Sequence, residues 1–232
     1  MNYEQLQNLK LKRGGYMMLD TKTLYQLLYE HMGPQGWWPA ESKIEVMLGA
    51  ILVQNTNWRN AAYAIESLKQ ATHLEPQHIL NLKLEALQVL IKSSGFYKNK
   101  AQTILSLLTW LDHHDFDYQE INNRYKQDLR KTLLEIKGIG SETADVLIVY
   151  IFGGVEFIAD SYSRRLYRKL GYTQTDSYEQ LKRHIKLPDD FSNQDANEFH
   201  ALLDNFGKNY FNGKINSKYT FLDAYFENET SG

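Results

Sequence analysis

Cysteine is absent from the 232-residue sequence. The chain can therefore form no disulfide, no zinc site or iron–sulfur cluster held by thiolates, and no covalent intermediate on a cysteine. Proline is scarce, with 4 residues, so few positions interrupt a helix by lacking a backbone N–H. Any fold must rest on packing alone, and any chemistry must use other side chains.

An excess of charge is also lacking, since 26 lysines and arginines stand against 28 aspartates and glutamates, for a formal net charge of -2. Any hold on nucleic acid would have to come from local groups and backbone amides. No apolar run approaches the roughly 18 residues that a membrane helix needs. The N-terminal "MNYEQLQNLKLKRGG" lacks the apolar centre of a secretory signal. We expect a cytoplasmic protein without membrane contact.

The residues that are present favour helices, because apolar side chains recur at helical spacing along most of the chain. The segment "KIEVMLGAILVQ" follows a predicted N-cap, Ser42, and is apolar nearly all round, which predicts a central helix. "VLIVYIF" would also suit a strand, but it follows a tight corner and has no partner segment. We predict an all-α fold with helices over 21–31, 42–54, 57–70, 76–82, 84–92, 98–113, 127–136, 142–152, 161–170, 178–187 and 194–211.

A glycine corner in "LLEIKGIGSETADVLIVY" joins two of these predicted helices. Gly138 and Gly140 can adopt positive φ, and Ile139 between them can anchor the corner in the core. The free N–H groups that begin the next helix could then bind a phosphate without net positive charge. A plain turn is the alternative, but the complete pattern matches a helix-hairpin-helix, which holds a DNA backbone without reading its bases. The predicted contact residues are Lys137, Gly138, Ile139, Gly140 and Ser141.

Asp160 in "FIADSYSRRLYRKLG" follows an apolar stretch and precedes a predicted helix. Aspartate is among the best N-cap residues, so a purely structural role is one interpretation. The other is chemical, because a carboxylate near bound DNA could stabilise positive charge on a sugar as its base departs. It could also take a proton from the attacking water.

Four blocks in this order resemble the helix-hairpin-helix DNA glycosylases, of which endonuclease III is a familiar member. The blocks are "EVMLGAILVQNTNWRNAAYAIESL", "IKSSGFYKNKAQTIL", "KGIGSETAD" and "ADSYSRRLYRKLG". The resemblance implies a two-lobed all-α fold with a DNA-binding cleft between the lobes. One lobe, 39–154, would carry the hairpin, and the other, 1–38 with 155–232, would carry the catalytic Asp160.

Two departures narrow the branch of the family. Bifunctional members have a lysine where this chain has Glu142, and a carboxylate cannot form a Schiff base, so lyase chemistry at this position is excluded. The cysteines that hold the iron–sulfur cluster of endonuclease III are missing as well. With "GWWP" and "QNTNW", these departures make the chain look most like the 3-methyladenine DNA glycosylases of the endonuclease III class.

That resemblance implies a base pocket formed by Trp37, Trp38, Trp58, Glu142 and Lys208. Aromatic faces attract a cationic alkylated base, and the acid would favour the same charge. Lys208 matches a family "H-G-K" motif in which the histidine is replaced here by Phe206. The alternatives are ordinary packing for the tryptophans, a first-turn position for the acid and a solvated surface position for the lysine.

The resemblance also implies that Gln54 fills the gap left by a flipped base and that Phe96 wedges the opposite strand. Lys98 and Lys100 are candidate phosphate contacts. The histidines lack metal-ligand spacing, so we assign no metal site and no catalytic histidine.

The expected protein is a monomeric, monofunctional glycosylase acting on an alkylated purine such as 3-methyladenine in damaged double-stranded DNA. It would need no cofactor, although a structural monovalent cation on the hairpin carbonyls is compatible with the family. The alternatives are a glycosylase for a neutral lesion, meaning uracil, a mismatched base or an oxidised purine, and a DNA-binding module without chemistry.

Overall fold

The computed structural model describes residues 11–13, 16–36, 40–214 and 216–226. The chain divides into two compact units, Trp38–Gly154 and Met1–Trp37 with Val155–Gly232. This division differs by one residue from the lobes expected at 39–154 and at 1–38 with 155–232. Each unit has a hydrophobic core of its own.

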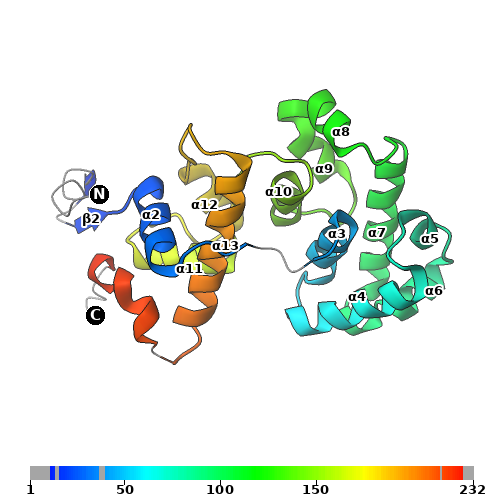
Figure 1. The fold of residues 1–232 in the computed structure, drawn as a ribbon, viewed down its shortest axis with the longest axis horizontal. Coiled ribbons are helices and arrows are strands. Elements are labelled where there is room, and N and C mark those ends of the chain that lie inside the picture. The colour runs from blue at the N-terminus through cyan, green and yellow to red at the C-terminus, as the bar shows by residue number, and fades with distance from the viewer. Residues whose placement is uncertain (1–10, 14–15, 37–39, 215, 227–232) are drawn as a thin grey trace. The chain divides into compact units, whose positions relative to one another are not determined.

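The unit Trp38–Gly154 consists of helices only, among its described residues (Figure 1). They are α3 (Lys43–Leu52), α4 (Trp58–Thr72), α5 (Pro76–Leu80), α6 (Leu84–Leu90), η1 (Lys92–Ser94), α7 (Tyr97–Asp112), α8 (Tyr118–Tyr125), η2 (Lys126–Asp128), α9 (Leu129–Glu135) and α10 (Ser141–Tyr150). The prediction of a central helix is confirmed, because α3 is buried from Val46 to Leu52 and packs against α4, α7 and α10. The Ser42 side chain accepts a hydrogen bond from Glu45 N, as expected of its N-cap.

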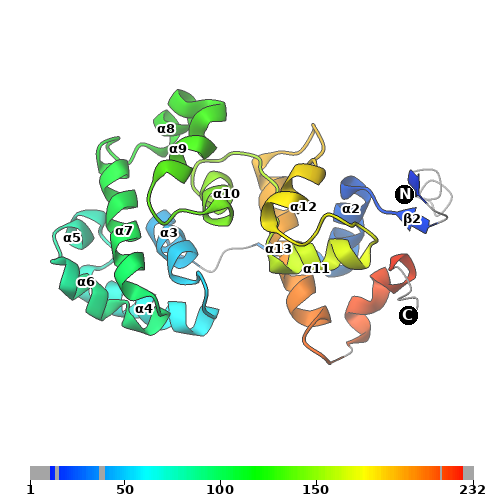
Figure 2. The same ribbon diagram turned by 180° about the vertical axis from the view of Figure 1, so that it is seen from behind.

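The second unit packs a long helix against its neighbours. It contains β1 (Leu11–Arg13), β2 (Tyr16–Met18), α2 (Thr21–Met32), α11 (Ser161–Lys169), α12 (Tyr178–His184), α13 (Asn193–Tyr210) and η3 (Ser217–Tyr225). Helix α13 contacts α2, α11 and η3, and Figure 2 shows it passing behind α11. Phe199, Leu202, Leu203 and Phe206 project from α13 into the core of this unit.

The all-α prediction is confirmed, and the structure adds a strand pair and the helices α8 and η3 to the predicted elements. Strands β1 and β2 form an antiparallel hairpin in which Leu11 pairs with Met18, and three residues are too few for alternation to reveal a strand. Helix α8 was not expected because its sequence, YQEINNRY, buries only Ile121 and so lacks a periodic apolar face. Asp117 nevertheless caps it, accepting from Gln119 N and Glu120 N. None of the helices in the described ranges has both the length and the apolar character required to span a bilayer.

Candidate nucleic-acid interface and catalytic residues

The corner between α9 and α10 is built around one glycine in the left-handed region. Gly138 has φ +92°, whereas Gly140 has φ −91°, so only the first of the two glycines uses the positive φ that both can adopt. A methyl group at Gly138 would lie 1.8 Å from the hydroxyl oxygen of Thr103 on α7. Ile139 is buried, and its N–H donates to Ile136 O at 3.0 Å, which closes the turn. The hairpin therefore needs glycine at 138 both because the backbone there has positive φ and because Thr103 leaves no room for a Cβ atom.

The outer side of this corner presents backbone to solvent. Lys137, Gly138 and Gly140 are exposed, and Ser141 is half-buried. Gly140 is the N-cap residue of α10, and no side chain caps this helix end. The N-terminus of a ten-residue helix combines N–H donors with the positive end of the helix dipole, which suits an anion such as a phosphate.

An ion pair between a half-buried arginine and a buried aspartate links the two hairpin helices. Arg130 Nε of α9 donates to Asp145 Oδ1 of α10 at 2.8 Å, and Arg130 Nη2 lies 3.4 Å from Asp145 Oδ2. Asp145 has no exposed surface. Sequence reasoning missed Asp145, because a polar residue in an otherwise apolar helix gives no sign of its partner. Arg130 therefore has a structural role in the hairpin.

Gln54 lies against the hairpin in this structure. Its Nε2 donates to Thr143 Oγ1 at 2.9 Å and to Gly138 O at 3.3 Å. The residue expected to enter the DNA is therefore adjacent to the residues expected to hold the backbone. The Gly138 carbonyl, one of those that a monovalent cation would use, already has a donor, and the cation stays a prediction.

Phe96 and Lys100 lie near the start of α7 and differ sharply in exposure. Phe96 has φ +47° and is 67% exposed, an unusual state for a bulky aromatic residue. Lys100 is buried, and its Nζ donates to Leu52 O at 2.8 Å and Ser94 O at 2.7 Å. Its assignment as a phosphate contact is wrong, because the ammonium ties the end of α3 to η1. Burial lowers the pKa of Lys100. Lys98 is exposed.

The expected base-pocket residues are only partly described. Trp58 is the first residue of α4, capped by Asn57, and is 39% exposed. Glu142 is exposed in the first turn of α10. Trp37 and Trp38 lie outside the described residues. Trp58 and Glu142 belong to the same unit as Gln54, Trp38–Gly154, and they remain candidate base-pocket residues.

Asp160 is the N-cap of α11 in the other unit. Its Oδ1 accepts from Ser163 N at 2.7 Å, and 11% of its side chain is exposed. Burial acts to raise the pKa of this carboxyl group, but His200 and the amide and hydroxyl of Ser163 outweigh it and hold the pKa below its usual range. The carboxylate is thus ionised at neutral pH and still reachable. The N-cap interpretation and the chemical one are compatible, since each uses a different oxygen.

Helix α13 brings further groups to Asp160. A methyl group at Gly207 would lie 2.4 Å from Tyr162 Cβ, so glycine is what lets α11 and α13 approach so closely. His200 Nε2 lies 3.8 Å from Asp160 Oδ2, and Lys208 Nζ lies 2.6 Å from Asp204 Oδ2. Lys208 is exposed, and its nearest acid is on its own helix. Sequence reasoning did not assign His200 or Asp204, although their spacing of four residues was visible. Among the described residues, no group of three or more acidic or histidine side chains could hold a metal ion.

Comparison with known proteins accounts for this combination of a hairpin and an ionised aspartate. Residues 48–188, which include both features, match the family described as HhH-GPD superfamily base excision DNA repair protein. A Methanocaldococcus jannaschii protein named as a candidate DNA repair glycosylase is 36% identical over 185 residues, covering 78% of this chain and 83% of that protein. Endonuclease III of Sulfolobus acidocaldarius is 29% identical over 159 residues, covering 68% and 69% of the two chains.

A solved structure agrees with these relatives. The H. pylori 3-methyladenine DNA glycosylase bound to 1,N6-ethenoadenine superposes with a TM-score of 0.67 at 27% identity, covering 82% of this chain and 98% of that chain. The hairpin, the capped aspartate and these relatives agree with one another, and the chain belongs to the HhH-GPD superfamily of base excision DNA repair proteins.

Proposed function

We propose that this DNA glycosylase is monofunctional and releases alkylated purines such as 3-methyladenine from duplex DNA. The observation that carries the proposal is the setting of Asp160, a nearly buried carboxyl group at the start of α11 whose pKa is held below its usual range by His200 and Ser163. The α10 amides at the hairpin would hold the DNA backbone, and the damaged nucleotide would be flipped out of the stack.

The proposed reaction is a hydrolysis at the sugar. The bond between the base nitrogen and C1′ breaks with its electron pair going to the base, which neutralises an alkylated, cationic purine. The Asp160 carboxylate stabilises the positive charge that grows on the sugar and accepts a proton from water as the water oxygen bonds to C1′. An abasic site and a free base result, and no cofactor enters the balance.

Glu142 supports the monofunctional assignment. A carboxylate at this position cannot attack C1′ as an amine does, so no Schiff base forms there. Borohydride treatment during turnover should trap no covalent protein–DNA adduct, while the Glu142→Lys variant supplies the missing amine and should give one. Trapping of the unaltered chain at a level equal to that of Glu142→Lys would contradict the proposal.

The substrate class rests on Trp58, on Glu142 and on the likeness to the H. pylori enzyme. An exposed indole attracts a cationic ring by about 0.5–2 kcal/mol, and the negative charge of Glu142 would add to that preference where it faces the same base. Release should be measured on duplexes that contain 3-methyladenine, 7-methylguanine, uracil or 8-oxoguanine. We expect methylated purines to be released fastest. Release of uracil or 8-oxoguanine alone would move the chain to the neutral-lesion class while leaving the fold and family intact.

A matched pair of variants tests Asp160. Asp20 is the N-cap of α2 in the same unit and accepts from Thr23 N at 2.8 Å, so it repeats the capping role without the proposed chemistry. Asparagine caps a helix about as well as aspartate. Asp160→Asn should therefore abolish base release yet keep DNA binding, whereas Asp20→Asn should retain both. Full activity in Asp160→Asn would remove the residue from its catalytic role.

A further inference from the structure

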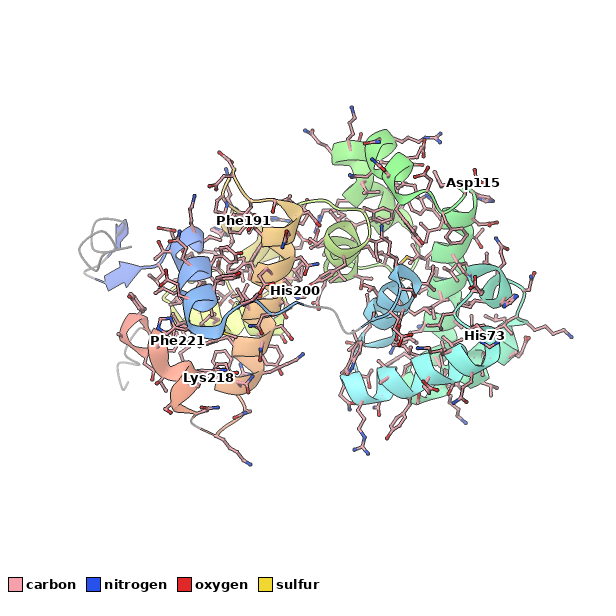
Figure 3. All side chains as sticks on the ribbon, in the orientation of Figure 1. His73, Asp115, Phe191, His200, Lys218 and Phe221 are labelled. Atoms are coloured by element: carbon pink, nitrogen blue, oxygen red, sulfur yellow. The ribbon has the colours of Figure 1, made fainter. Side chains whose placement is uncertain are left out.

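The side chains of His200, Asp204 and Lys208 form a row along α13. They are spaced four residues apart, which places them one above another on one helix face. Contacts with Asp160, at the start of α11, and within the row show that this face turns toward that aspartate. Figure 3 labels His200, which lies midway along α13. The row and Asp160 lie within one unit, so their geometry does not depend on the placement of the other.

The two oxygens of Asp160 have different neighbours. Oδ1 is occupied by the Ser163 amide, while Oδ2 has His200 Nε2 at 3.8 Å. That distance is too long for a direct hydrogen bond but short for an electrostatic attraction between side chains that are 7% and 11% exposed. Oδ2 is thus the oxygen that can face a substrate, and His200 is the group nearest to it.

Two acidic side chains, Asp204 and Asp160, lie close enough to His200 to interact with it electrostatically. Asp204, on the next turn, also acts on it electrostatically, but Asp204 pairs with Lys208 at 2.6 Å. Burial raises the pKa of Asp204, and Asp160 acts in the same direction. Helix α2 packs against α13 as well, but its Tyr25 donates to Asp195 instead. Asp160 is a second acid close to His200, with its Oδ2 3.8 Å from His200 Nε2.

We propose that His200 is a positioning residue for the reaction, holding Oδ2 of Asp160 ionised and in place beneath the sugar. This inference rests on the proposed role of Asp160. His200 and the groups of Ser163 together offset the cost of burying the charge of the Asp160 carboxylate, while Asp204 is paired with Lys208. Without His200, only Ser163 would oppose the effect of burial, which favours the protonated carboxyl group, and that form can neither stabilise a sugar cation nor accept a proton from water.

His200→Gln tests the inference, because glutamine keeps the volume and a donor but cannot carry charge. The first measurement needs no substrate. The carboxyl carbon of Asp160 is titrated by NMR in 13C-aspartate-labelled protein and identified by its loss in Asp160→Asn. We expect its titration midpoint to move to higher pH in His200→Gln. The matched control is His114→Gln on the other unit, where the half-buried ring contacts Trp110 O and the Tyr125 hydroxyl, and it should leave the midpoint unchanged.

The second measurement is the pH profile of single-turnover base release with saturating enzyme and methylated duplex DNA. In His200→Gln, the acidic limb should move to higher pH along with the Asp160 midpoint, while affinity for a duplex with an abasic-site analogue stays within about twofold. A purely structural loss would lower the rate equally at every pH.

The outcomes separate the two proposals. If Asp160→Asn is inactive but His200→Gln keeps both the titration midpoint and the pH profile, the inference about His200 is wrong and the proposed function stands. If Asp160→Asn releases base normally, the proposed role of Asp160 fails, whatever the midpoint shows. A shift of both midpoint and profile in His200→Gln alone supports the inference.

Discussion

Replacing Gly138 with alanine tests the hairpin most directly. The φ of +92° puts an L-residue in a region that costs about 1–2 kcal/mol. The added methyl group would also lie 1.8 Å from Thr103 Oγ1, 2.9 Å from its Cβ and 3.0 Å from its Cγ2. Rotating the threonine clears the oxygen but not the Cβ, so backbone must shift, and such overpacking costs about 1–3 kcal/mol. We expect Gly138→Ala to lower the free energy of unfolding by about 3 kcal/mol.

The matched control is two residues away. Gly140 has φ −91°, and a methyl group there would meet nothing within 4 Å. Gly140→Ala should therefore change stability by less than about 1 kcal/mol, the usual size of an N-cap effect for these two residues. Urea unfolding at 25 °C, followed by circular dichroism, measures both variants.

The contribution of Thr103 can be separated with a double-mutant cycle. Thr103→Ala removes Oγ1 and Cγ2, so in the Gly138→Ala background it should recover part of the lost stability and leave the cost of the positive φ. Affinity for duplex DNA should fall in Gly138→Ala, because the α10 amides move with the corner. Equal unfolding midpoints for Gly138→Ala and Gly140→Ala would refute the claim that the corner requires glycine at 138 but not at 140.

Three further variants address other features. Phe96→Gly should raise stability by up to about 1 kcal/mol by relieving a left-handed aromatic residue, and it should slow base release if Phe96 wedges the opposite DNA strand as the family resemblance implies. Thermal melting and single-turnover rates measure these two effects, and a loss of stability would contradict the first. Lys100→Met should cost about 1–3 kcal/mol, since two buried carbonyls lose their donor; urea unfolding should resolve this, and an unchanged midpoint would mean that water replaces the ammonium. Asp160 has a pKa below its ordinary 3.8, so its ionisation stabilises the fold above that pH and this contribution is lost as the pH falls through the lower folded value. The stability of the unaltered chain relative to Asp160→Asn should therefore be constant above about pH 5 and decline below pH 3.8 in urea titrations; a constant difference at all pH values would contradict the shift.

Local patterns were sufficient to predict the framework of the fold. The apolar run after Ser42 identified the central helix, and the spacing of Gly138, Ile139 and the following small residues identified the hairpin. Asp160 was recognised as an N-cap by its position alone. These features depend on neighbours in the sequence, which is why periodicity and capping rules were enough.

Features that depend on partners far along the chain could not be predicted. Lys100 carries a charge that suggested a phosphate, and its burial follows from carbonyls 48 and 6 residues away. In the sequence, Asp145 and His200 are ordinary polar residues of predicted helices. Only the structure shows that Arg130 lies beside Asp145 and that Asp160 lies beside His200. The φ of Gly140 was also beyond reach, because a Gly-x-Gly corner needs only one left-handed residue and the sequence does not say which.

The Arg130–Asp145 pair has a consequence for how binding should respond to ionic strength. An arginine matched to a buried aspartate brings no net positive charge to the hairpin, so it should displace few of the cations condensed around a duplex. Neutral amides displace none, and the exposed Lys137 contributes about one. In the proposed role, the corner itself would hold DNA chiefly by uncharged donors, and its share of the affinity should persist at salt concentrations that strip lysine-rich proteins from the duplex.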